Sequence, residues 1–348
     1  LMRTLESATT IGGSAAVLAA PPPPNMGHEA RQPGELWIYA VYALVAVGCI
    51  VLGYYQFHAI VLRILAIANR EHGIRALAYP GLFWLGLGFL LIVIRTIFWI
   101  LYRPAPPATR DGAPSPTVII PACNEGAMVL QSIESAVKAD YSHDRLEVLV
   151  IDDGSKDDTW SYISQAAARY PGLVTALRQD RNRGKREALA LGFSRARGEI
   201  LVTIDSDSVI ERGALLALAG PFRDPKIGAV AGRVEVYNRR HGIIPQMLHV
   251  RYMLSFDMLR ATESVYRNVY CCPGALTGLR AAGVRRVLDR WKNQQFLGSR
   301  CTFGEDRAMT NYLLDSGYDT VYQRTAVVHT LVPSKYAKLC KMLLRWDR

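Results

Sequence analysis

Residues 198–208 read Gly-Glu-Ile-Leu-Val-Thr-Ile-Asp-Ser-Asp-Ser, an apolar run that ends in the acidic pair Asp205 and Asp207. The run predicts a buried strand over 200–204. Side chains two residues apart in a strand point to the same side, so both carboxylates face one place at its carboxyl end. Ligands bind at that end in open α/β sheets, and two oxygen ligands suit Mg²⁺ or Mn²⁺. Taken alone, Asp-Ser-Asp also fits a polar turn that merely closes a strand.

The pattern around this stretch predicts an α/β fold with a mostly parallel sheet. From Thr117 onward, short apolar runs of strand type alternate with longer helical patterns, which is typical of such sheets. After Gly232 the pattern becomes mixed, with a long helix expected over 243–266, an extended segment over 268–278 and a helix over 303–316. Strands are expected at 117–120, 146–151, 173–177, 199–204 and 227–231, and helices between them at 127–138, 157–169 and 185–195.

Three other acidic stretches occupy comparable places. One follows the first expected strand, one follows the second, and one begins the helix at 303–316. A cationic turn at 182–186 begins another helix, where the helix N-terminus and the basic side chains both favour phosphate. Each stretch has a simple structural explanation as a turn or a cap, but together they converge on one crevice suited to a diphosphate. The residues are Asn124 and Glu125, then Asp152 and Asp153, then Glu305 and Asp306, with Lys185 in the cationic turn.

Composition limits the partners. The formal net charge of +11 favours an anionic partner, which is a phosphate compound, a nucleic acid or the inner leaflet of a membrane. The basic residues are scattered or near the apolar stretches and form no nucleic-acid motif, so we expect no nucleic acid as a partner. None of the six cysteines forms a Cys-x-x-Cys pair, which argues against a zinc site and favours reduced thiols.

The chain divides into five segments. Residues 1–35, rich in Ala, Gly and Pro, are expected to be disordered, and 104–116 is a Pro-rich linker. Two largely uncharged stretches within 36–103 are each long enough for a bilayer, which takes about 20 apolar residues, so a transmembrane hairpin is predicted. Arg95 in the second stretch either lies near the interface or pairs inside a helix bundle, and buried helices of a soluble core are the alternative for both stretches. The α/β domain over 117–333 and an amphipathic interface helix over 334–348 complete the chain.

The order and spacing of these motifs resemble the family 2 glycosyltransferases, specifically the processive membrane synthases. The likeness is greatest to hyaluronan synthases and rhizobial chitooligosaccharide synthases, through Asn-Gln-Gln-Phe-Leu-Gly at 293–298 and Cys-Thr-Phe-Gly-Glu-Asp-Arg at 301–307. The resemblance implies a GT-A type, Rossmann-like domain. It also implies inverting, metal-dependent transfer from a UDP-sugar to a growing β-linked polysaccharide, at the cytosolic face of the plasma (inner) membrane.

The resemblance leaves the product open. It favours hyaluronan-type synthesis from UDP-N-acetylglucosamine and UDP-glucuronate. The alternatives are a chitin-type or other single-sugar synthase and, from another class, a non-catalytic UDP-binding membrane protein.

The resemblance also assigns roles by position. Asp306 would be the general base, and Asp207 would bind Mn²⁺ or Mg²⁺ with Asp205 beside it. The sequence departs from the family at Met342, which replaces the Gln of a Gln-x-x-Arg-Trp motif. It also stops at Arg348 where related synthases continue, so we expect a truncated chain, with an absent tail as the alternative. The nucleotide and its diphosphate would contact Asn124, Glu125, Asp152, Asp153, Lys185, Asp205 and Arg345, and the acceptor would contact Cys272, Gly274, Thr277 and Trp346.

Overall fold

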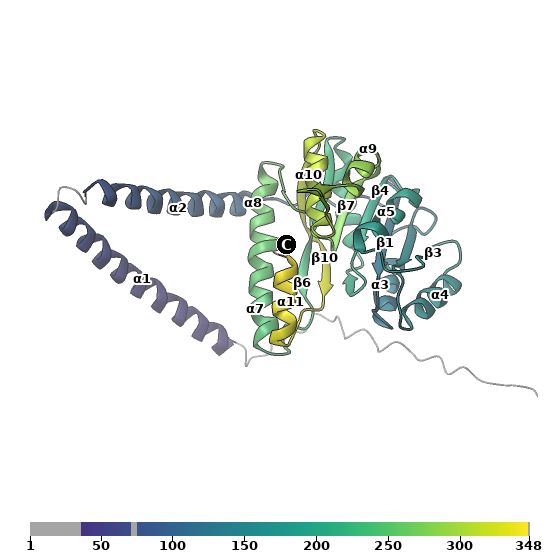
Figure 1. The fold of residues 1–348 in the computed structure, drawn as a ribbon, viewed down its shortest axis with the longest axis horizontal. Coiled ribbons are helices and arrows are strands. Elements are labelled where there is room, and N and C mark those ends of the chain that lie inside the picture. Colours follow the sequence, from purple (N-terminus) through teal and green to yellow (C-terminus); the bar gives the residue numbers. More distant parts are fainter. Residues whose placement is uncertain (1–35, 71–74, 347–348) are drawn as a thin grey trace, which may run out of the picture.

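The computed structural model describes residues 36–70 and 75–346. The segment expected to be disordered, 1–35, lies outside the described residues. Two helices, α1 (Leu36–Arg70) and α2 (Arg75–Leu101), correspond to the predicted hairpin and extend away from the rest of the molecule (Figure 1). Over the described ranges, no helix combines the length and the apolarity that a membrane span requires. The predicted spans are therefore not confirmed.

The remainder is built on one eight-stranded sheet, which confirms the predicted α/β class. The strand order is β3-β2-β1-β4-β7-β6-β10-β5, with β1, β2, β3 and β4 parallel to one another and β10 parallel to β6. Strand β7 runs antiparallel to both β4 and β6, and the edge strand β5 is antiparallel to β10. The strands are β1 (Pro116–Ala122), β2 (Glu147–Asp152), β3 (Val174–Arg178), β4 (Ile200–Ile204), β5 (Ser208–Ile210), β6 (Ile227–Val236), β7 (Leu276–Arg280) and β10 (Asp319–Thr330).

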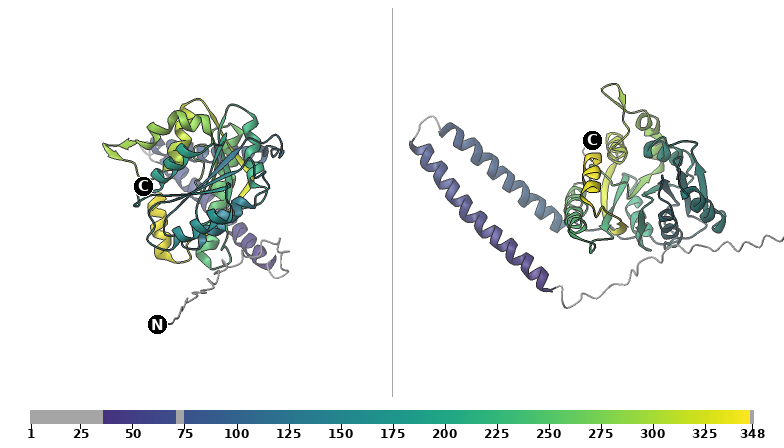
Figure 2. Two further views of the ribbon diagram at one scale, coloured as in Figure 1. Left: turned by 90° about the vertical axis from the view of Figure 1, so that its right-hand side faces the viewer. Right: turned by 60° about the horizontal axis from the view of Figure 1, so that its bottom comes forward.

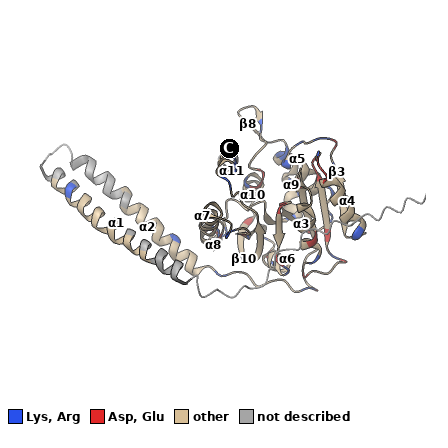
Figure 3. Ribbon diagram, turned by 90° about the horizontal axis from the view of Figure 1, so that it is seen from below, with Lys and Arg blue, Asp and Glu red and all other residues tan. Residues whose placement is uncertain are grey.

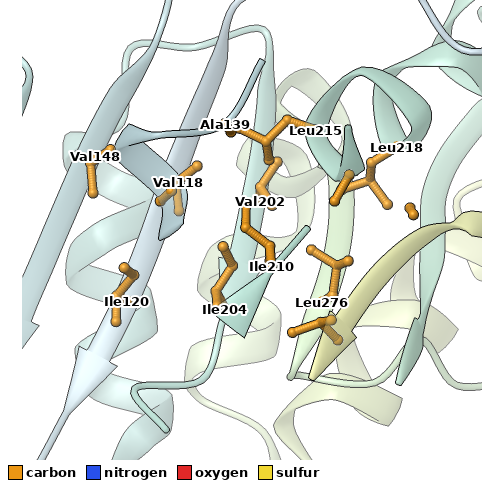
Figure 4. Packing of buried hydrophobic residues seen from close by; sticks show 14 of the residues in the cluster. Val118, Ile120, Ala139, Val148, Val202, Ile204, Ile210, Leu215, Leu218 and Leu276 are labelled. Atoms are coloured by element: carbon orange, nitrogen blue, oxygen red, sulfur yellow. The ribbon is translucent and has the colours of Figure 1, made fainter. Parts of the chain in front are cut away.

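Helices cover both faces of this sheet, which explains why the central strands are apolar without alternation. Val118 and Ile120 of β1 belong to one core cluster, shown in Figure 4, and Ile119 between them belongs to the other. The first cluster contains residues of α3 (Met128–Val137), α4 (Thr159–Arg169), α6 (Ala214–Ala219) and α7 (Ile243–Tyr252). The second contains residues of α5 (Lys185–Arg195), α9 (Ala281–Lys292) and α10 (Glu305–Asp315).

The second half of the chain contains elements that the sequence pattern did not predict. The long helix expected over 243–266 is interrupted by a π-helical turn at Met253–Met258 before α8 (Leu259–Val265). The segment expected to be extended ends in β7, and a short hairpin of β8 (Gln295–Phe296) and β9 (Ser299–Arg300) precedes α10. Figure 2 shows this hairpin projecting from the domain. The last helix, α11 (Tyr336–Trp346), lies where the amphipathic helix was expected.

Candidate active site

The first group of predicted residues surrounds the turn that follows β2. The amides of Arg183 and Gly184 donate to the two carboxylate oxygens of Asp153, at 2.7 and 2.9 Å. Gly154 lets these two loops approach, because its φ is +66° and a Cβ there would lie 2.3 Å from the carbonyl carbon of Arg181. Burial raises the pKa of Asp153 despite these amides. The carboxylate therefore fixes the 181–184 turn at the start of α5.

Asp152, the neighbouring acid, is buried within the protein. Its Oδ1 accepts the amide of Ser155 at 3.0 Å. Its Oδ2 lies 3.2 Å from Nε of Arg178, a charge contact without hydrogen-bond geometry. Asp152 thus supports the loop, and its predicted contact with the nucleotide remains a prediction.

Asn124 and Glu125 follow β1, and their side chains have different surroundings. Asn124 adopts a left-handed conformation, with φ of 57°, and its side-chain oxygen accepts the amide of Lys156 at 2.8 Å. Burial raises the pKa of Glu125, and the charges of Asp207 and Asp205 raise it further. The charges of the two aspartates thus act on Glu125, which the sequence placed only in the nucleotide pocket.

Lys185 links the acidic pair after β4 to the start of α10. Its Nζ lies 2.5 Å from Oδ1 of Asp205 and 3.5 Å from Oε1 of Glu305. Burial would lower the pKa of Lys185, but the charges of Asp205 and Glu305 outweigh it and raise that pKa. Gly274 leaves room for the ammonium group, since a Cβ there would come within 2.9 Å of Nζ. The lysine is therefore a fixed cation at this edge of the sheet.

Asp306 completes this group. Its Oδ2 accepts the amide of Gly274 at 3.3 Å, and its Oδ1 accepts the amide of Arg307 at 2.7 Å. Burial raises the pKa of Asp306, and the charge of Glu305 adds to the shift. A carboxylate with a raised pKa is a better proton acceptor than an exposed one, so this group has the properties of a general base.

The residues predicted to contact the acceptor are largely buried, or their side chains lie outside the described part of the chain. Cys272 is buried, with its amide donating to Thr310 at 3.0 Å, and the Thr277 hydroxyl donates to the Pro273 carbonyl at 2.6 Å. Acceptor contacts by Cys272, Gly274 and Thr277 remain predictions. The side chains of Arg345 and Trp346 lie outside the described residues. Met342, at the position of the motif Gln, packs against the first core cluster.

The acidic residues offer the ligand type that Mg²⁺ and Mn²⁺ prefer. Burial raises the pKa of Asp207, the nearby charge of Asp205 adds to the shift and that of Lys185 opposes it, so a bound cation would favour the ionised form of Asp207. The two carboxylates therefore fit a divalent ion. Within the described part of the chain, however, no three His, Cys, Asp or Glu side chains are arranged to hold a metal ion by themselves. A metal here would need further oxygen ligands from water or from a diphosphate.

Comparison with known proteins finds relatives of this chain. Residues 117–288 match the family model described as Glycosyl transferase family 2. An N-acetylglucosaminyltransferase of Azorhizobium caulinodans is 30% identical over 235 residues, which cover 68% of this chain and 59% of that protein. A hyaluronan synthase of Streptococcus pyogenes is 32% identical over 262 residues, which cover 74% of this chain and 61% of the relative. The chain thus spans less than two thirds of the length of either curated relative.

A solved structure has a similar fold. The mannosyltransferase PcManGT from Pyrobaculum calidifontis, in complex with GDP-Man and Mn²⁺, is 25% identical with a TM-score of 0.56. The likeness covers 75% of this chain and 72% of that one. The polar edge described above therefore belongs to a domain of glycosyltransferase type.

Proposed function

This chain belongs to the family 2 glycosyltransferases through residues 117–288, and we propose that it transfers a sugar from a UDP-sugar to a hydroxyl group of a growing β-linked polysaccharide. One observation carries the proposal. Lys185 joins Asp205, after β4, to Glu305, beside the candidate base Asp306. These contacts support a donor site and an acceptor site at a single edge of the sheet.

The donor would bind across the turn after β2 and the start of α5. Asp153 holds the 181–184 turn by its backbone amides, and Lys185 follows directly as a fixed cation. A helix start with an adjacent cation favours phosphate groups, so this is where the diphosphate of the donor would lie. The relatives named above are consistent with an N-acetylglucosamine donor.

Transfer would proceed by direct displacement with Asp306 as the base. Asp306 accepts the proton of the acceptor hydroxyl while that oxygen forms a bond to the anomeric carbon. The bond from that carbon to the diphosphate oxygen breaks, and its electron pair leaves with UDP. Attack from the opposite face converts an α-linked donor into a β-linked product. Such assistance is typically worth about 10²–10⁴-fold in rate.

Two cations would offset the negative charge that develops on the departing UDP. Lys185 supplies one from the protein. The other would be Mn²⁺ or Mg²⁺ held by Asp207 and Asp205, which when bound would stabilise the departing diphosphate as a Lewis acid. The Mn²⁺ in the complex of the similar mannosyltransferase supports a divalent ion of this kind.

The polymer is proposed to be of hyaluronan type, made from UDP-N-acetylglucosamine and UDP-glucuronate. The similarity to the Streptococcus pyogenes hyaluronan synthase supports this choice. The similarity to an N-acetylglucosaminyltransferase, 30% over 235 residues, favours a single-sugar polymer of chitin type as the second candidate.

Attachment to the cytosolic face of the inner membrane through residues 36–103 is also a proposal. What supports it is the exposure of large apolar side chains along α1 and α2, among them Leu44, Ile50, Phe89 and Ile92. Fractionation of the whole chain tests it. We expect the protein in the membrane pellet after an alkaline wash, and recovery in the supernatant without detergent would contradict attachment.

The activity itself is tested by UDP release. The purified chain is incubated with Mn²⁺ or Mg²⁺ and with UDP-N-acetylglucosamine, UDP-glucuronate, both together, or UDP-glucose as the control donor. Turnover that needs both donors, with a product cut by hyaluronidase, supports the first candidate. Turnover with N-acetylglucosamine alone, with a product cut by chitinase, supports the second. Binding of UDP without turnover under any of these conditions would refute the proposed activity of this chain.

A further inference from the structure

Arg186, the second residue of α5, is a buried cation with an unusual set of partners. Arg186 is only 5% exposed to solvent. Among the described residues, no carboxylate lies within ion-pairing distance of it, and its Nε has no hydrogen-bond partner. Burial lowers the pKa of Arg186. Burying a charge without an opposite charge is costly, so this position has to provide something that an apolar side chain would not.

The guanidinium group binds the segment that joins α9 to α10. One nitrogen, Nη1, donates to the carbonyl of Trp291 at 2.8 Å and to Oε1 of Gln294 at 2.9 Å. The other, Nη2, donates to the carbonyl of Phe303 at 3.2 Å. Gln294 precedes the β8–β9 hairpin and Phe303 follows it, so one side chain holds both ends of the hairpin. Figure 3 shows the hairpin, labelled β8, extending beyond the ends of α5 and α10.

Trp291 carries the connection onward to the base. The guanidinium lies over its indole ring, 5.2 Å from the centroid, and the indole is fully buried. Its Nε1 donates to the carbonyl of Glu305 at 2.8 Å. Glu305 directly precedes Asp306 and pairs with Lys185, the residue before Arg186. The first two residues of α5 therefore hold the start of α10 by two separate routes.

We propose that Arg186 is a positioning residue, which fixes the 291–303 segment so that Asp306 lies where the acceptor hydroxyl is deprotonated. The inference rests on the proposed function of Asp306 as base. Lysine cannot replace arginine here, because three oxygen atoms in different directions need the planar fork of a guanidinium group.

The test compares turnover with donor binding. The variants are Arg186→Lys, which keeps the charge, and Trp291→Phe, which keeps an aromatic ring but removes the indole donor together with part of the buried ring. Arg195→Lys, an exposed arginine on the same helix, is the matched control. UDP release is measured with UDP-N-acetylglucosamine plus UDP-glucuronate and Mn²⁺, and UDP affinity is measured by calorimetry. A misplacement of about 1 Å costs on the order of 100-fold in rate.

We expect kcat to fall about 10- to 100-fold in Arg186→Lys and Trp291→Phe, with the donor KM and the UDP affinity within about threefold of the parent. The control should match the parent. A kcat within about twofold of the parent in Arg186→Lys would overturn the inference, as would a loss of UDP affinity equal to the loss of kcat. Asp306→Asn, measured alongside, separates the two proposals. If it retains turnover, the base assignment fails. If it is inactive while Arg186→Lys is not impaired, only the positioning role fails.

Discussion

Substitution of Gly154 by alanine adds a single methyl group but should lower both the stability of the fold and the affinity for UDP. The residue has a φ of +66°, and an alanine there costs about 1–2 kcal/mol from the left-handed conformation alone. The added Cβ would also lie 2.3 Å from the carbonyl carbon of Arg181 and 2.4 Å from the amide nitrogen of Asn182. Both are backbone atoms, so the turn itself must move, which adds about 1–3 kcal/mol of overpacking. The unfolding free energy should fall by about 2–5 kcal/mol in total.

Gly172 supplies the matched control. Its φ is +80°, and no atom lies within 4 Å of the position of its Cβ, so Gly172→Ala costs only the conformational part, about 1–2 kcal/mol. Urea unfolding measures both variants, and calorimetry measures their affinity for UDP. Because the displaced turn carries the amides bound to Asp153, we expect UDP affinity to fall by about tenfold or more in Gly154→Ala alone, which corresponds to about 1.4 kcal/mol. Equal unfolding free energies in the two variants, with UDP affinity unchanged, would refute this reasoning.

Three further predictions concern the charged groups. Asp306→Asn should lower kcat by at least about 100-fold and leave UDP affinity unchanged, as measured by UDP release and calorimetry. Turnover close to the parent would contradict the assignment. Lys185→Gln removes a charge that lowers the pKa of Asp306, so the acid limb of the pH–kcat profile should move to higher pH. An acid limb at the same pH in this variant would contradict an effect of Lys185 on the pKa of Asp306. Glu125 and Asp207 have pKa values above their ordinary values, so their ionised forms destabilise the folded state. Stability in EDTA should therefore rise as the pH falls from neutral through these raised values toward about 4, and added Mn²⁺ should remove the rise. Thermal unfolding that is independent of pH in EDTA would count against this cluster.

Much of the first half of the domain was predictable because its signals are local. The strands at β1, β2 and β4 are continuous apolar runs, and each ends in the polar residues that the sequence singled out. The helix expected at 185–195 has those bounds in the structure. Parallel sheets leave this strong pattern since both faces of each strand are buried.

The second half was less predictable because its structure depends on distant partners. Strand β7 is short and lies at the end of a segment expected only to be extended, and it becomes a central strand by pairing with β4 and β6. Arg186 reads as part of a solvated cationic turn, and nothing near it in the sequence reveals its three acceptors more than 100 residues away. The charge of Asp207 likewise acts on Glu125 only because β1 and β4 pair in parallel.

The antiparallel β7 has a consequence for how the site is held together. The chain between Ile204 and Leu276 passes through β5, β6 and the helices α6, α7 and α8, yet these two residues are direct partners across β4 and β7. The paired Cα atoms of antiparallel strands are about 4.5–5.5 Å apart, whatever the intervening chain does. Asp205 and Gly274 are thus the two ends of a closed excursion. Because this pairing does not depend on the number of residues between its two ends, the positions of Asp205 and Gly274 next to each other are fixed by β4 and β7 themselves.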